Sequence, residues 1–146
     1  MPITVTGLKE LSDALTTQTN EAAKRYLSKV MEPAAQIVVD AAEKTAPVHI
    51  GILEEAIVWQ KKWQSGEGET SANIAIGPLK SVYWGELQEW GTQEVFGKDK
   101  HGKPFHHAAQ PPQFWMTRAW EGCKEQVLEK FVEGAKEMTK WIKARK

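Results

Sequence analysis

Residues 74–92, with the sequence IAIGPLKSVYWGELQEWGT, constrain the fold more than any other stretch of the chain. Alternating residues at its start are typical of a strand, and Gly77-Pro78 predicts a turn, because proline has no N–H to continue a β-ladder. Beyond this turn, four large apolar residues recur at helical spacing: Tyr83, Trp84, Leu87 and Trp90. The segment therefore predicts a strand, a turn and a short helix that ends at Gly91, and we expect the aromatic face of this helix to dock on a sheet.

Two longer segments carry apolar residues at the period of an α-helix. The first covers residues 23–44, and its apolar positions stay in phase on both sides of Pro33, which predicts one bent helix with Asn20 as a candidate N-cap. The second covers residues 114–146 and ends in lysines and an arginine, which complement the helix dipole. A shorter leucine stripe over residues 7–16 predicts a further helical segment.

The middle of the chain predicts a β-hairpin and a long loop. Residues 52–64 carry strand-like residues (Ile57, Val58 and Trp59) after a short acidic start, and residues 71–76 alternate as a strand. A polar, glycine-rich turn at 65–70 separates the two runs. Residues 95–113 form an expected loop, which is long for a compact domain and is expected, like the 65–70 turn, to become ordered on assembly. We predict one α+β domain over residues 1–146, in which the two long helices pack on a small, mainly antiparallel sheet with the aromatic helix between.

Charge and cysteine content exclude several classes of protein. Lys plus Arg and Asp plus Glu each number 19, and a formally neutral chain is not expected to bind nucleic acid by charge. Cys123 is the sole cysteine, which excludes an internal disulfide and fits a reducing compartment. The N-terminal sequence does not resemble a signal peptide, and no apolar run is long enough to predict a membrane span.

Three histidines in the expected loop are candidate metal ligands. His101, His106 and His107 lie close in sequence, and imidazole is a common ligand. However, two adjacent histidines are poorly placed for one ion, and no cysteine or carboxylate stands at the usual ligand spacing. A solvated polar loop is the favoured interpretation, and we predict no metal ion.

Catalytic and cofactor sites are also not expected. Cys123 lies on the apolar stripe of the last helix, where a free cysteine is usually a small buried hydrophobe. Glu86 and Glu89 are three residues apart on the side of the short helix that we expect to be exposed, so they are expected to be solvated or paired with lysine. Neither GxGxxG nor a P-loop motif is present. The sequence therefore predicts no catalytic residue and no cofactor.

Aromatic residues are the main candidates for an interface. Seven tryptophans exceed what one small core needs, and Trp and Tyr are enriched at interface hot spots, although they could also form the core. Both interpretations stay open for the aromatic set, which includes Trp120. The candidate interaction residues are Tyr83, Trp84, Trp90, Thr92, Phe105, Phe114, Trp115 and Arg118.

Four motifs, in order, resemble the tail-completion (neck) family of long-tailed bacteriophages and prophages, which is named after gene product ten of a lambda-like coliphage. They are GLKEL at 7–11, AEKTAPVHIGILEEAI at 42–57, IGPLKSVYWGELQEWGT at 76–92 and AAQPPQFWMTRAWEG at 108–122. The second resembles the family pattern A-P-V-x-T-G-x-L-x-x-S-I, from which Ile50 and Ala56 depart. The third resembles V-G-P…Y-A-x-F-V-E-F-G-T, and the fourth resembles A-x-P-F-L-R-P-A-x-E.

This resemblance implies a virion structural protein rather than an enzyme. Such a protein is made in the host bacterial cytoplasm and sits at the head–tail joint, as a homo-oligomeric ring between head-closure and tail proteins. DNA passes through the ring as cargo, and neither a membrane nor a small-molecule substrate is implied. The alternatives are a nucleic-acid-binding module that uses Lys98, Lys100, Lys103 and the basic C-terminus, or a small enzyme that joins a histidine of the 101–107 loop to Cys123 or Glu86.

Overall fold

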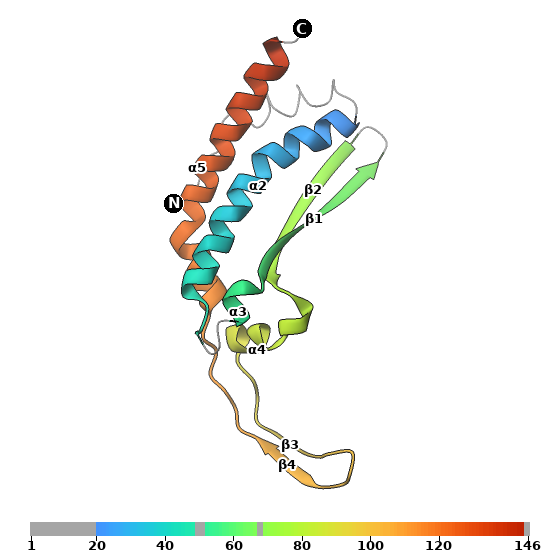
Figure 1. Ribbon diagram of the computed structural model, residues 1–146, viewed down its shortest axis with the longest axis vertical. Coiled ribbons are helices and arrows are strands. Elements are labelled where there is room, and N and C mark those ends of the chain that lie inside the picture. Colours follow the sequence, from blue (N-terminus) through green and yellow to red (C-terminus); the bar gives the residue numbers. More distant parts are fainter. Residues whose placement is uncertain (1–19, 49–51, 67–68, 145–146) are drawn as a thin grey trace.

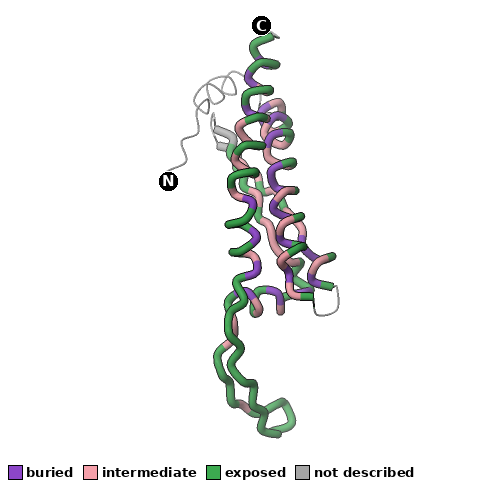
Figure 2. Tube along the Cα trace, turned by 90° about the vertical axis from the view of Figure 1, so that its left-hand side faces the viewer, coloured by how far each residue is buried: buried purple, intermediate pink, exposed green. Residues whose placement is uncertain are grey.

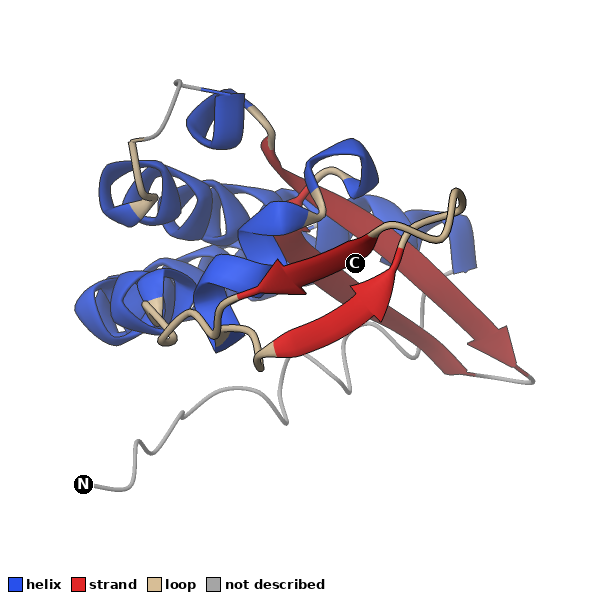
Figure 3. Ribbon diagram, turned by 90° about the horizontal axis from the view of Figure 1, so that it is seen from below, coloured by secondary structure: helices blue, strands red, loops and turns tan. Residues whose placement is uncertain are grey.

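The computed structural model describes residues 20–48, 52–66 and 69–144, and their fold is α+β (Figure 1). Two long helices, α2 (Asn20–Thr45) and α5 (Trp115–Ala144), pack together, and a short helix, α4 (Trp84–Trp90), lies between them in sequence. The strands form two separate antiparallel hairpins rather than one small sheet (Figure 3). The predicted fold class is thus confirmed. The helical stripe predicted at 7–16 lies outside the described residues.

The helices α2 and α5 run antiparallel and side by side (Figures 1 and 2). At one end, Tyr26 and Trp141 meet edge to face with their ring centroids 5.2 Å apart. At the other end, the hydroxyl of Thr45 donates a hydrogen bond of 3.0 Å to the carbonyl of Trp115. Between these ends the two helices approach closely, because a Cβ at Gly134 of α5 would lie 3.4 Å from the Cα of Val30 in α2.

The prediction of one helix through Pro33 is confirmed, because α2 continues past it. A proline inside a helix costs about 3 kcal/mol through its lost N–H and its clash with the preceding turn. The apolar stripe that stays in phase across Pro33, with Val30 and Val38 both buried, offsets that cost. Asn20, the predicted N-cap, is the first residue of α2.

The predicted hairpin consists of β1 (Ile57–Gly66) and β2 (Glu69–Pro78), and it lies on the side of α2 away from α5 (Figure 1). The face toward α2 is partly buried and carries apolar residues of both strands: Trp59, Trp63, Ala72, Ile74 and Ile76. The predicted alternation of β2 is thereby confirmed. The main core lies where α2, α3, the start of β1 and the start of α5 meet. Leu53 of α3 (Ile52–Glu55) and Trp115 are its largest fully buried side chains.

Three predicted details of this hairpin were wrong. Gly77-Pro78 is not a turn but the end of β2, paired with Val58 and Ile57, since proline is tolerated where a strand ends. The run predicted over residues 52–64 is a strand only from Ile57, where its strand-like residues begin, and its acidic start forms the helical turn α3 instead. The turn predicted at 65–70 is shorter, because the strands pair as far as Gly66 and Glu69.

The prediction of a loop at 95–113 was also wrong in part, because this segment contains a second hairpin. Strand β3 (Val95–Lys98) pairs with β4 (Pro104–His107), and Thr92 pairs with Gln110 at the base. We call residues 92–110 the arm. It projects from the end of the helical body, opposite the C-terminus (Figure 1), and is exposed along nearly its whole length (Figure 2). Four-residue strands that contain glycine or proline give too weak a pattern to be predicted from sequence.

Candidate interaction site

Helix α4 turns its large apolar residues outward. It follows a 3-10 turn, η1 (Lys80–Val82), and buries Gly85 and Glu89. Tyr83 and Trp90 are 67% and 70% exposed, and Leu87 is 42% exposed. The expectation that the aromatic face would dock on a sheet is therefore wrong for these three residues. Only Trp84 turns partly inward, against the core.

The buried side of α4 is fixed by Glu89, which we expected to be solvated. Its Oε2 accepts a hydrogen bond of 2.7 Å from the backbone N–H of Met116. Its Oε1 accepts bonds from the backbone N–H and the hydroxyl of Thr117, at 3.1 Å and 2.5 Å. These N–H groups belong to the first turn of α5, where no intrahelical partner exists and a negative charge is favourable. Glu89 thus caps α5. The residue is only 4% exposed, so its carboxylate needs these hydrogen-bond partners inside the protein.

A tryptophan beside this cap ties α4 to α5 a second time. The indole N–H of Trp115 donates a hydrogen bond of 3.0 Å to the carbonyl of Gly85. Trp115 is completely buried, so its N–H needs a partner inside the protein. The two connections together hold α4 against the first turn of α5.

The arm leaves the body at this junction through a strained and crowded backbone. Gly91 has φ 74°, and a Cβ there would lie 2.5 Å from the carbonyl oxygen of Gln110, so no other residue fits without a shift. Phe114, on the returning side, has φ 50°, which is uncommon for a bulky residue. Backbone hydrogen bonds from Gln113 to Gln88 and from Phe114 to Glu89 hold the two sides together. The direction of the arm is therefore set by the body.

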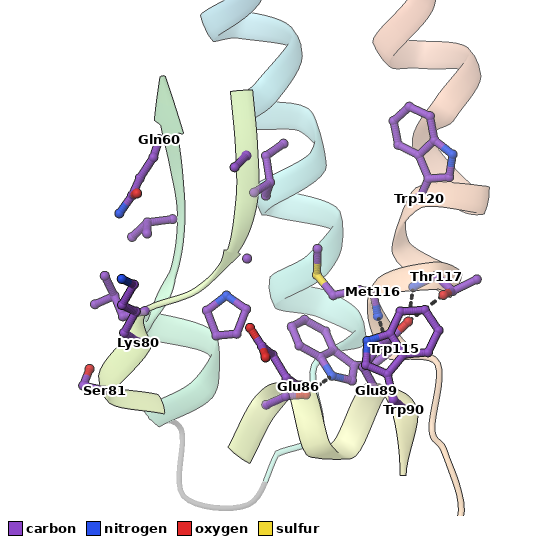
Figure 4. A pocket seen from close by; sticks show the side chains of 17 residues that line it. Gln60, Lys80, Ser81, Glu86, Glu89, Trp90, Trp115, Met116, Thr117 and Trp120 are labelled. Carbon is purple, nitrogen blue, oxygen red and sulfur yellow. Dashed lines mark hydrogen bonds between the residues drawn. The ribbon is translucent and has the colours of Figure 1, made fainter. Parts of the chain in front are cut away.

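An open groove of about 1030 Å³ lies between the β1–β2 hairpin and the first turns of α5, and α4 closes one end (Figure 4). Its lining is mostly apolar, and the half-exposed Trp120 stands on the α5 side, across from Gln60 on the strand side. The residues that line the groove are Val58, Gln60, Ala75, Ile76, Gly77, Pro78, Leu79, Lys80, Ser81, Gly85, Glu86, Glu89, Trp90, Trp115, Met116, Thr117 and Trp120.

The structure brings some of the predicted interaction residues together and separates others. Trp90 and Phe114 meet edge to face with their ring centroids 6.4 Å apart. Tyr83, which lies two helical turns before Trp90, is also exposed. Trp84 is half-buried, and Trp115 is part of the core. The remaining three stand apart from this group: Thr92 in the bridge at the base of the arm, Phe105 in β4, and Arg118 exposed on the first turn of α5.

The titratable residues do not converge on the groove. His106 lies in the arm, 2.7 Å from a carboxylate oxygen of Glu94, and over the described ranges no three metal-ligating residues cluster. Cys123 is buried in α5, as predicted, and this burial raises the pKa of its thiol. The groove is lined by Glu86 but by neither a histidine nor Cys123, so the set that the enzyme alternative needs is not assembled there.

The lysines that the nucleic-acid alternative needs are also separated. Lys98, Lys100 and Lys103 lie in the arm, whereas Lys140 and Lys143 lie near the C-terminal end of α5, at the opposite end of the structure (Figure 1). These two groups therefore do not share one face. Within the part of the chain that the structure describes, no helix combines the length and apolar character that crossing a bilayer requires.

Residues 9–91 match the HK97-gp10-like family model, which is described as "Bacteriophage HK97-gp10, putative tail-component". This is a class of phage structural proteins, generally without enzymatic activity. The match covers more than half of the chain, so the protein belongs to the HK97-gp10-like family of bacteriophage tail components, and the predicted resemblance is confirmed. No curated protein and no solved structure matched the chain. The matched region ends at Gly91, so the arm and α5 lie outside it.

Sequence reasoning missed the role of Glu89, and no local signal could have revealed it. Its partners Met116 and Thr117 are 27 and 28 positions away in the chain. A capping box is recognisable because its residues are three positions apart, whereas this cap exists only once α4 and α5 are in contact.

Proposed function

We propose that the protein is a tail-completion component that assembles as a ring at the head–tail joint of a phage or prophage virion made in the bacterial cytoplasm. Family membership supports the role in the tail. The observation that carries the ring is the exposed apolar group at the root of the arm, made up of Tyr83, Leu87, Trp90 and Phe114. Residues of this kind become buried at interface cores, where they contribute most of the binding energy.

The ring closes through heterologous contacts. A contact in which one surface of a copy meets a different surface of the next generates a ring whenever the rotation closes. Head-closure and tail proteins then contact the two faces of the ring, and DNA passes through its lumen. A formal net charge of zero supports this role, because a strongly basic lumen would hold DNA by its phosphates.

The test is the mass of the purified protein by light scattering after size exclusion, over a wide concentration range. We expect discrete multiples of the monomer mass and ring-shaped particles in electron micrographs. The double variant Tyr83→Ala, Trp90→Ala should remain monomeric where the unaltered protein assembles, because both side chains are exposed in the monomer. Val48→Ala, which truncates an exposed apolar side chain that belongs to neither α4 nor the arm, is the matched control and should assemble normally.

Two results would contradict the ring. One is a monomer at every concentration, both alone and with the head-closure protein. The other is a continuous series of sizes, which indicates that the contact does not close. DNA binding that weakens steeply with salt would instead favour the nucleic-acid alternative.

A further inference from the structure

The arm lacks a partner for its own apolar side chains within the described body. All residues of β3 and β4 are exposed except Gly97, which is partly buried, and Phe96 is 71% exposed. An isolated two-stranded hairpin is marginally stable in water, so a surface that covers the arm would stabilise it.

Each face of the arm carries an aromatic pair. Phe96 stacks on His106 with ring centroids 4.4 Å apart, and Phe105 leans on His107 at 5.2 Å on the other face. The ring of Phe105 lies across Gly97, where a Cβ would come within 2.7 Å of it. Because both faces are apolar, insertion into a groove covers the arm better than contact with a flat surface.

The groove beside α4 has the character of such a receptor. Its volume of about 1030 Å³ is at the upper end of the range for ligand pockets, which is roughly 300–1,000 Å³. Its lining is mostly apolar, with Ile76 and Met116 along its sides and Trp120 exposed to receive a ring.

The arm of a copy does not lie in its own groove. Gly91 and the bridge between Thr92 and Gln110 fix its root, and the arm extends away from the body (Figures 1 and 2). An arm that occupies the groove therefore comes from another molecule.

We infer that the arm of one copy inserts into the groove of the next copy, an inference that rests on the proposed ring. A heterologous contact needs two different, complementary surfaces on one chain, and the arm and the groove are such a pair. Their charges also complement each other. In the arm, three lysines (Lys98, Lys100 and Lys103) outnumber two carboxylates (Glu94 and Asp99). The groove is lined by Glu86, Glu89 and one lysine, Lys80; the exposed Glu86 is the carboxylate available to the lysines of the arm, because the buried Glu89 already caps α5.

The contact can be tested by disulfide cross-linking between two single-cysteine versions of the full chain. Cys123→Ala removes the native thiol. Lys98→Cys then labels the arm, and Ser81→Cys or Gln60→Cys labels the strand side of the groove (Figure 4). Lys136→Cys, exposed on α5 outside the groove, is the matched control. Pairs are mixed, assembled at a concentration where light scattering shows particles, and oxidised.

We expect the arm variant to link to at least one groove variant at least tenfold faster than to the control, because docking raises the effective thiol concentration to roughly the millimolar range. Particles that assemble without this preference overturn the inference but leave the ring standing. Preferential links in dimers or open chains support the inference and contradict the ring. A monomer at all concentrations contradicts both.

A second variant tests the same contact without a cross-link. Phe96→Ser with Phe105→Ser removes both phenylalanine rings of the arm, and neither residue is part of the core. We expect an unchanged melting temperature and a loss of assembly. Normal assembly of this variant would overturn the inference.

Discussion

Glu89 and Thr117 lie 28 positions apart in the chain and are joined by two hydrogen bonds, one from the Thr117 backbone N–H and one from its hydroxyl. This contact fastens the C-terminal turn of α4 to the N-terminal turn of α5. The arm follows α4 directly, and residues 111–114 lead from its end into α5, so the contact also fixes the direction in which the arm leaves the body.

Replacing the capping carboxylate should destabilise the protein. Glu89→Gln keeps the size of the side chain but removes the charge and turns an amide NH₂ toward backbone donors. We expect the free energy of unfolding to fall by about 1–2 kcal/mol, as for the loss of a helix cap with a buried donor left unpaired. Urea denaturation measures the change. Glu86→Gln, exposed on the same helix, is the control and should stay within about 0.5 kcal/mol of the unaltered protein. Equal losses for both variants would show that Glu89 is not a cap.

Removing the buried indole N–H should cost more. Trp115→Phe leaves a void in the core and the carbonyl of Gly85 without its donor, so we expect a loss of about 2–4 kcal/mol. Thermal unfolding followed by circular dichroism measures this loss. Trp120→Phe, the same change at a half-exposed position of α5, should change stability by less than about 0.5 kcal/mol. If Trp115→Phe unfolds at the temperature of the unaltered protein, the junction is not held as described.

Lys61 links the β1–β2 hairpin to α2 and should contribute to stability. Its ammonium group pairs with Glu32, donates to the hydroxyl of Ser28 at 3.1 Å, and lies near the ring of Trp59. Lys61→Ala should lower the free energy of unfolding by about 1–2 kcal/mol, through lost packing of the stem and a lost cation–π contact as well as the ion pair. Lys62→Ala, on the exposed face of the same strand, should have little effect. A strong salt dependence of the difference would indicate that the ion pair, rather than packing, dominates.

The buried thiol predicts a pH dependence at the alkaline end. Burial raises the pKa of Cys123 in the folded protein, whereas the unfolded chain keeps the ordinary thiol pKa of about 8.5. The contribution of Cys123 to stability is therefore fully present below pH 8.5 or so and is lost as pH rises through the raised pKa. Unfolding measured between neutral and alkaline pH should show a steeper fall for the unaltered protein than for Cys123→Ala. Identical pH profiles would contradict the assignment.

Much of the fold could be predicted because long elements carry their own signal. The stripe across Pro33 predicts α2 as one helix, and the alternation of Ala72, Ile74 and Ile76 predicts β2. The hairpin of the arm could not be predicted, because apolar and polar residues alternate too few times in a four-residue strand to distinguish it from a loop.

The candidate site was harder to predict than the fold. Tyr83 and Trp90 were selected as interface candidates by residue type, and the structure places both at the surface, while the same argument also selected Trp115, which is buried in the core. The type of a residue determines how much area its side chain can bury. It does not determine whether that side chain packs in the core of the protein or against a partner.

The sequence by itself determined the helices α2, α4 and α5, the first hairpin and the family, since periodicity and short motifs are local properties of the chain. Only the tertiary structure decided which face of α4 is buried. The bonds from Trp115 to Gly85 and from Thr117 to Glu89 connect residues about thirty positions apart. They turn a carboxylate inward and three large apolar side chains outward, against the hydrophobic pattern of the helix. The physical reason is that the free N–H groups at the start of α5 and the indole N–H of Trp115 need buried acceptors, and α4 supplies them.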